Sequence, residues 1–329
     1  VGRAYVGFWF HCSPNPDLAT VGAASLELGT LLRSAPPKLS ALLRNIFNLS
    51  LAAQLLADGT DVAAFHAIRT QLELINLYAD ARLTSTLLQQ AAVATVTVMA
   101  TRRRLSVRKV TIGHSALDAV IQSGVLTESG DLVSFVHHVL FDHIAGRFYL
   151  EWDDPDALLA QLAGDTTVAL LLAPALRFAV EQLWRADNAG RSLSWKLITG
   201  IFQANSIDPV LGNVALRIVV ENIEAEQDIA GLVALVVGSP AEPWLAPLAT
   251  RLAFFSKIVS EPNRGLTSQV AIAWGRLALA LLTSGERALV HPARVLLHTL
   301  FDRGDFEDAA VQQIFGQAAR LLLQLAWTP

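Results

Sequence analysis

Apolar residues recur along most of the chain at the three-to-four-residue spacing of amphipathic helices. Between positions 39 and 56 they keep the i, i+3, i+4 pattern, with Pro36 and Pro37 before them and Asp58–Gly59 after them. The same spacing predicts a second helix over about 61–83 and a third over about 86–103. The first part of the chain is therefore expected to be helical.

The pattern changes after Val110. Residues 115–123 predict a short helix, and two short Thr-, Val- and Phe-containing segments surround Ser129–Gly130. They predict a β-hairpin between about 124 and 135, to which we expect the strands to be confined. Residues 137–151 then predict a strong helix. Helix, helix, two-stranded wing and helix is the layout of a winged-helix domain.

After position 152 the sequence shows only helical patterns, separated by Asp, Gly, Asn and Pro. Amphipathic helices in series predict an α-solenoid or an irregular helical array. The fold class is therefore mostly α, with expected domains at 1–83, 84–152 and 153–329. Tryptophans recur in the last of these, and packing between helices is the favoured interpretation over a binding surface: Trp184, Trp195, Trp244, Trp274 and Trp327.

Composition narrows the functional classes. The chain is 53% hydrophobic and 16% charged, which suits a large packed core, and its net charge of −4 gives no reason to expect capture of nucleic acid or of a membrane. A single cysteine, Cys12, excludes an internal disulfide. Without an apolar run of about 18 residues, a cytoplasmic protein is expected. Because the chain begins at Val1 and its one methionine is Met99, we expect a piece of a longer protein.

Motifs for catalysis are missing from the sequence. It has no G-x-x-x-x-G-K-[ST], G-x-G-x-x-G, G-x-S-x-G or H-E-x-x-H, so no phosphate loop and no catalytic residue is expected. A nucleophile pair of Cys12 and His11 is disfavoured, because adjacent residues rarely meet productively.

One helix carries a dense polar group, formed by His137, His138, Asp142 and His143. His138 and Asp142 have i, i+4 spacing, but a metal site needs a third ligand, so no metal is expected. Two other interpretations stay open. The histidines cap the helix or are satisfied in the core, or one imidazole faces a phosphate at the helix N-terminus.

Three segments, in order, resemble the bacterial STAND-type (NACHT-like, AAA+-related) ATP-binding proteins downstream of their nucleotide-binding core. Residues 42–49 (Leu-Leu-Arg-Asn-Ile-Phe-Asn-Leu), with 51–56 and 68–74, resemble the helical lid of the NTPase domain. Residues 133–147 resemble the winged-helix signature of an aromatic, then a histidine, then an acid. Residues 170–178, leading to Trp184, resemble the start of a helical sensor array.

The resemblance implies specific roles. His137 matches the winged-helix histidine that reaches the phosphates of bound ADP in the resting state, since Phe135 precedes it by two and Asp142 follows by five. Ile46 stands where the family's lid has a proline that packs on adenine. ATP or ADP with Mg²⁺ is the cofactor of the parent protein, and tight binding to this chain alone is not expected.

The implied function is regulatory. This chain would act as the nucleotide-dependent switch and sensor of the parent NTPase, in bacterial defence signalling, and would not itself be an enzyme. Its expected partners are the upstream NTPase domain, a protein trigger and further copies on activation, with neither nucleic acid nor membrane.

Two alternatives remain. A winged-helix DNA-binding regulator is disfavoured because residues 115–123 lack Arg and Lys. The cluster Arg102–Arg104 with Arg108 and Lys109 could touch a phosphate backbone, although a solvated helix end also explains it. The other alternative is an α-helical scaffold with no link to nucleotides.

Overall fold

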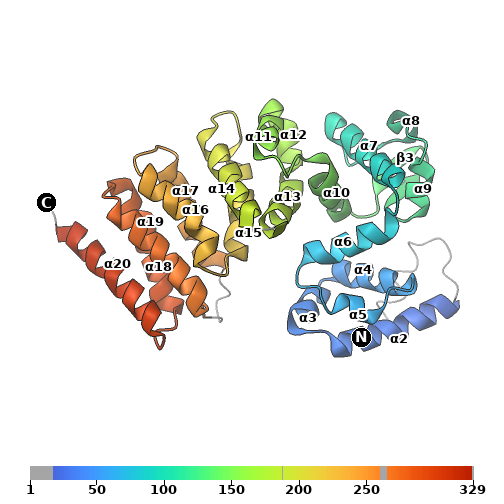
Figure 1. Ribbon diagram of the computed structural model, residues 1–329. Helices are drawn as coiled ribbons and strands as arrows, with labels where there is room; N and C mark the ends of the chain where they lie inside the picture. The colour runs from blue at the N-terminus through green and yellow to red at the C-terminus, as the bar shows by residue number, and fades with distance from the viewer. Residues whose placement is uncertain (1–17, 187, 260–264, 328–329) are drawn as a thin grey trace. The chain divides into compact units, whose positions relative to one another are not determined.

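The protein divides into two compact units, residues 1–149 and 150–329. The structure, a computed structural model, describes residues 18–186, 188–259 and 265–327 (Figure 1). Most of these residues are helical, and the described part holds one three-stranded antiparallel sheet. The mostly α fold class is thereby confirmed. Residues 1–83 and 84–149 fall within one unit, and the finer division into three domains stays a prediction.

The first half of unit 1 contains short helices with polar caps: α2 (Leu18–Ser34), α3 (Pro37–Leu43), α4 (Ile46–Ala57), α5 (Val62–Phe65) and α6 (Gln71–Arg82). A single helix over 39–56 was wrong. The chain leaves the helix at Arg44, and Asn45 caps α4 by accepting the Phe47 N–H at 2.9 Å. A single helix over 61–83 was also wrong, because Thr70 and Glu73 form a capping box that starts α6 anew.

The second half of unit 1 builds the small sheet. Its elements are α7 (Thr86–Arg102), β1 (Ser106–Arg108), α8 (Lys109–Ile112), α9 (Leu117–Gln122), β2 (Leu126–Ser129), β3 (Leu132–Phe135), α10 (His138–Ile144) and a π-helix (Ala145–Tyr149). The expected hairpin is confirmed as β2 and β3, with Gly130 at φ 64° in its turn. The strand order is β1-β3-β2. This order of elements fits the expected winged-helix layout.

The expectation that strands are confined to the hairpin was wrong. Strand β1 lies outside it and pairs antiparallel with β3, with Val107 opposite Val133. Three residues are too short to show an alternating pattern. The strand forms because the Val107 side chain is buried on the inner face of the sheet, while the side chains of its two neighbours are more exposed.

Unit 2 is a helical array (Figure 1). Its helices are α11 (Pro155–Gly164), α12 (Thr166–Leu171), α13 (Ala173–Ala186), α14 (Asn188–Gln203), α15 (Pro209–Asn222), α16 (Glu226–Gly238), α17 (Leu245–Val259), α18 (Ser268–Thr283), α19 (Arg287–Arg303) and α20 (Ala309–Trp327). From α13 onward each helix packs on the next but one. The result is two rows, α13-α15-α17-α19 and α14-α16-α18-α20. No strand occurs in the described part of this unit.

Tryptophans hold the core of unit 2 together. Trp184, Trp195 and Trp274 are all nearly fully buried, which confirms the packing interpretation for these three. The rings of Trp184 and Trp195 meet edge to face, with centroids 6.1 Å apart. The indole N–H of Trp195 donates to the Asp228 carbonyl at 2.7 Å, so its buried polar group is satisfied.

Among the described residues, no single helix is both long and apolar enough to cross a membrane. By length and composition alone, two sharply bent helix pairs pass the same test: α3 with α4, and α6 with α7.

Candidate functional site

The starts of α4 and α10 lie next to each other in unit 1. Phe47 is the second residue of α4 and His137 caps α10, and their rings stack with centroids 4.1 Å apart and planes 30° apart. Ile46, the predicted adenine contact, is half exposed at the tip of α4. The two positions singled out by the family resemblance are therefore brought to adjacent helix starts. The residue that contacts the imidazole is Phe47, which the sequence analysis did not single out.

The hydrogen bonding of His137 defines which ring nitrogen carries the proton. The Val139 backbone N–H donates to His137 Nδ1 at 3.2 Å, so the proton of the neutral ring is on Nε2. Partial burial, and then the nearby charge of His138, lower the pKa of His137 below its usual value. At neutral pH the side chain is thus an uncharged ring that caps α10 through Nδ1 and offers an Nε2–H donor.

His143, six residues further along, has a different role. It is fully buried, and its Nε2 lies 2.7 Å from Asn76 Oδ1 on α6. Arg147 donates to the same oxygen at 3.3 Å and forms a 2.8 Å ion pair with Asp80. Burial, and then the Arg147 charge, lower the pKa of His143 to about 3. This histidine is a neutral structural group that joins α10 to α6, as the core interpretation predicts.

Asp142 is the unusual acid of this helix. Its side chain is buried, with 8% of the residue exposed, and burial raises the pKa of its carboxyl to about 7. A carboxyl of this kind changes charge near neutral pH, whereas exposed aspartates are ionised there. Within the described part of the chain, no three His, Cys, Asp or Glu side chains are grouped to hold a metal ion. His11 and Cys12 lie outside the described residues.

Helix α6 connects the end of α4 with the turn before β2. The Tyr78 hydroxyl lies 3.0 Å from Gln54 Oε1 of α4 and 3.3 Å from the Gly124 carbonyl. Arg82 donates to the Ser123 carbonyl at 3.0 Å and also pairs with Asp58. One helix is thus bonded both to α4 and to the turn before β2.

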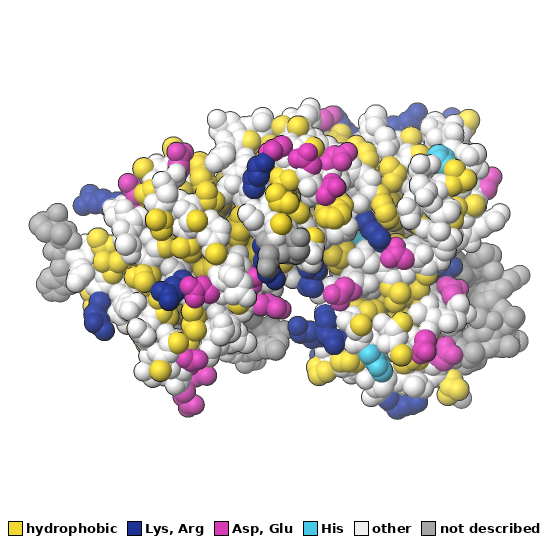
Figure 2. Space-filling model, viewed as in Figure 1, with side chains coloured by type: hydrophobic (Ala, Val, Ile, Leu, Met, Phe, Trp, Pro, Cys, Tyr) yellow, Lys and Arg dark blue, Asp and Glu magenta, His cyan; other side chains and the backbone are white. Residues whose placement is uncertain are grey.

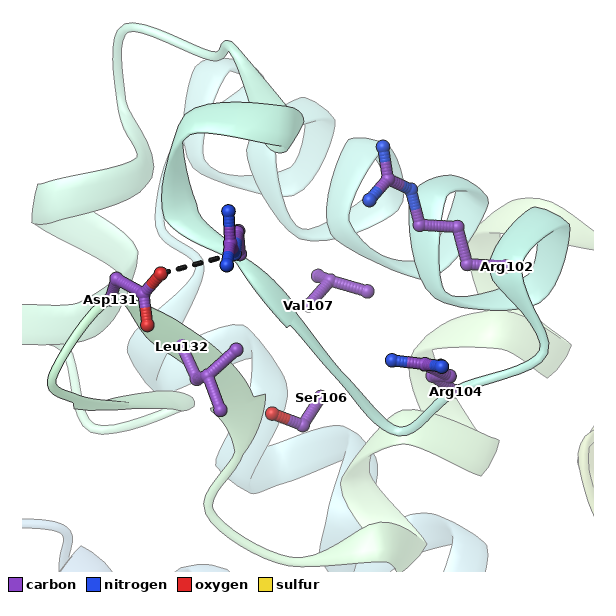
Figure 3. A pocket seen from close by; sticks show the side chains of 7 residues that line it. Arg102, Arg104, Ser106, Val107, Asp131 and Leu132 are labelled. Atoms are coloured by element: carbon purple, nitrogen blue, oxygen red, sulfur yellow. Dashed lines mark ion pairs between the residues drawn. The ribbon is translucent and has the colours of Figure 1, made fainter.

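A second candidate site lies beside β1. A hollow of about 650 Å³ is lined by residues from the end of α7, from β1 and from the β2–β3 turn (Figure 3): Arg102, Arg104, Ser106, Val107, Arg108, Asp131 and Leu132. Arg108 pairs with Asp131 at 3.2 Å, and both side chains are well exposed. The sequence offered a solvated helix end as the plain explanation for these arginines, and the structure gathers three of them around one hollow.

The comparisons add no family. No model of a known protein family matches the sequence, and a search of curated proteins finds no significantly similar one.

Unit 2 shows a different kind of surface (Figure 2). Hydrophobic side chains are spread over the face of the array shown in Figure 2, with charged groups between them. Large exposed apolar residues come from both rows of helices: Val210, Val237, Phe254, Ile258, Phe301 and Leu323. Apolar residues scattered in this way are common on protein surfaces and do not mark a site by themselves.

Proposed function

We propose that this chain is the regulatory and sensor portion of a STAND-type NTPase, in which the bound nucleotide holds a resting state. The observation that carries the proposal is the stacking of His137 on Phe47 at 4.1 Å. The contact places the histidine that is expected to bind phosphate against α4, the segment that is expected to form the lid and that contains Ile46. A nucleotide placed there would contact both segments at once, which is what a nucleotide-dependent switch requires.

The chemistry of His137 suits a phosphate ligand. Its Nδ1 is occupied by the Val139 N–H, so the group offered to an anion is the Nε2–H. Phe47 covers one face of the ring and limits its motion. The half-exposed side chain of Ile46 supplies an apolar surface for a base. The helix start itself adds little, because His137 already caps it.

In the proposed cycle, ADP keeps the winged-helix segment against the lid, and loss of that contact releases it. An upstream domain of the parent supplies Mg²⁺-bound ATP and its cleavage. The array of unit 2 receives a protein trigger, and released copies assemble to signal, in bacterial defence.

Loss of the Nε2 donor is the sharpest test in the parent protein. His137→Asn keeps a cap acceptor in the place of Nδ1 but removes the donor at Nε2, whereas His137→Ala removes both. One hydrogen bond to a charged group corresponds to roughly 1.5–3 kcal/mol. Both variants should therefore weaken ADP binding at least about tenfold and raise basal activity. Only His137→Ala should also lower the melting temperature, through the lost cap.

His138→Ala is the control at the neighbouring position: that side chain is exposed, and its ring centroid lies 4.3 Å from that of His137. It should leave ADP affinity and basal activity close to wild type. Equal effects of the His137 and His138 variants on ADP affinity would remove His137 from its assigned role. Loss of thermal stability in His137→Asn with unchanged ADP affinity would favour a purely structural histidine.

For this chain alone we expect no ATP hydrolysis and at most weak nucleotide binding, because its sequence has no phosphate loop. Calorimetric titration with ADP checks this. A sub-micromolar dissociation constant would contradict the proposal that the main nucleotide contacts come from another domain.

The DNA-binding alternative gains no support from the winged-helix segment. The one charged residue of α9 is Asp118, which would repel a phosphate backbone. Lys109 is already neutralised, at 2.6 Å from Asp118 and 2.8 Å from Glu128.

A further inference from the structure

Strand β1 is an edge of the three-stranded sheet. The Lys109 N–H donates to the Asp131 carbonyl at 2.8 Å, which makes this pair hydrogen-bonded. In an antiparallel ladder such pairs alternate, so Val107 is the next bonded residue. The backbone N–H and C=O of Ser106 and the N–H of Arg108 therefore point away from β3, toward the free edge. The Arg108 carbonyl already accepts the Thr111 hydroxyl at 2.6 Å.

The free edge is bordered by positive charge. Arg102, at the end of α7, and Arg104 line the same hollow as β1 (Figure 3). Within the described residues neither arginine has an ion-pair partner, whereas Arg108 is paired with Asp131. One apolar side chain of the lining, Leu132, is 42% exposed. A strand edge with open backbone groups, two arginines without an ion-pair partner among the described residues and an exposed leucine thus lie together.

We propose that β1 binds an extended acidic segment of a partner protein, which adds to the sheet as a fourth strand. The partner's backbone pairs with the outward N–H and C=O of Ser106 and with the N–H of Arg108, as in other cases of β-strand addition. Its carboxylates contact Arg102 and Arg104, and guanidinium groups suit carboxylates because they donate two parallel hydrogen bonds. An apolar side chain of the segment packs on Leu132.

A peptide fits this edge better than a nucleic acid does. The outward backbone of Ser106 presents a donor and an acceptor, and a peptide strand matches both. A phosphate backbone offers acceptors only and would place negative oxygens against the carbonyl of Ser106. The Asp131 carboxylate at the hollow would also repel a polyanion, whereas a short segment can place its acids beside Arg102 and Arg104.

Binding of a defined peptide tests this proposal, which is independent of the proposed nucleotide switch. The probe is a fluorescein-labelled peptide of alternating Glu and Val, about six residues long, the usual length of a strand. Anisotropy with the full chain should show saturable binding. The double variant Arg102→Glu/Arg104→Glu should weaken it at least about tenfold, since two charge-assisted contacts are lost. Lys38→Glu/Arg44→Glu, the same charge change at exposed positions elsewhere, should not.

The backbone part of the proposal is tested on the peptide, which leaves the protein unchanged. Two peptides are N-methylated at alternate amides, one at the odd and one at the even positions, which removes hydrogen-bond donors without altering charge. Only one of them loses the donors that face β1, and that peptide should lose saturable binding. Equal binding of both methylated peptides would show that charge alone attracts the probe and would overturn strand addition. Absence of saturable binding would overturn the proposal, and so would tighter, Arg102- and Arg104-dependent binding of a single-stranded DNA oligonucleotide.

Discussion

Replacing Asp142 by asparagine is expected to stabilise unit 1 at alkaline pH and to change little in acid. Burial raises the pKa of this carboxyl to about 7 in the folded chain, from an ordinary value of 3.8. Between these pH values the folded state holds a proton that the unfolded chain has released. Stability is therefore full below about pH 4 and falls as the pH rises through 7. Asparagine cannot ionise and escapes this loss.

The magnitude follows from the same two pKa values. Each pH decade between 3.8 and about 7 costs about 1.4 kcal/mol, which sums to about 4 kcal/mol at pH 8. The next residue, His143, acts in the opposite direction. Its pKa is about 3 in the folded chain against 6.5, so stability falls as the pH drops from 6.5 toward 3. In the wild type the two dependences largely cancel between about pH 4 and 6.5, and Asp142→Asn should reveal the acid sensitivity of His143.

Amide hydrogen exchange of the α10 segment, compared between wild type and variant at the same pH, measures the stability of unit 1 directly. Tryptophan fluorescence during urea unfolding serves as an internal reference for unit 2, where Trp184, Trp195 and Trp274 are buried. Asp118→Asn, at a largely exposed acid, is the control and should show no comparable pH-dependent gain. Equal protection of wild type and Asp142→Asn at pH 8 would refute the reasoning, as would a stabilisation that is the same at pH 4.

Two further predictions concern stability. Asn45→Ala should destabilise unit 1 by about 0.5–2 kcal/mol in urea unfolding, because it removes the cap of α4, and Asn45→Asp should retain most of it; an unchanged Asn45→Ala would show that the cap is dispensable. Gly275→Ala should destabilise unit 2 by about 1–3 kcal/mol, since its Cβ would lie 2.8 Å from Ile314 Cγ2, whereas Gly238→Ala, with open space around it, should not destabilise. Similar melting temperatures for these two glycine variants would contradict the close approach of α18 and α20.

The helical character of the chain could be predicted because apolar spacing reports burial. The ends of the helices were harder to predict, because the apolar spacing continues across Asn45 and Thr70 although the helical backbone is interrupted there. The capping box of Thr70 with Glu73 is visible in the sequence, and reading it would have placed the start of α6 correctly. Strand β1 had no such signal, because Val107 becomes a strand residue only through its partner Val133.

The candidate site was only partly predictable. His137 and Ile46 were selected by resemblance, but the contact between the two segments depends on the helical phase of α4. That phase is set by the cap at Asn45, and it turns Phe47, rather than Ile46, onto the imidazole. The raised pKa of Asp142 was likewise out of reach, because it depends on how fully neighbouring elements desolvate the carboxyl.

The two-row packing of unit 2 has a consequence for how it folds. Its principal contacts join helices no more than three places apart along the chain, so few of them require distant segments to meet. Proteins with such local contacts pay little loop-closure entropy before they gain packing energy, and they fold fast. Unit 2 is therefore expected to assemble stepwise from any adjacent group of helices. In unit 1, by contrast, β1 pairs with β3, and α8, α9 and β2 lie between them in the sequence, so this pairing must close a longer loop.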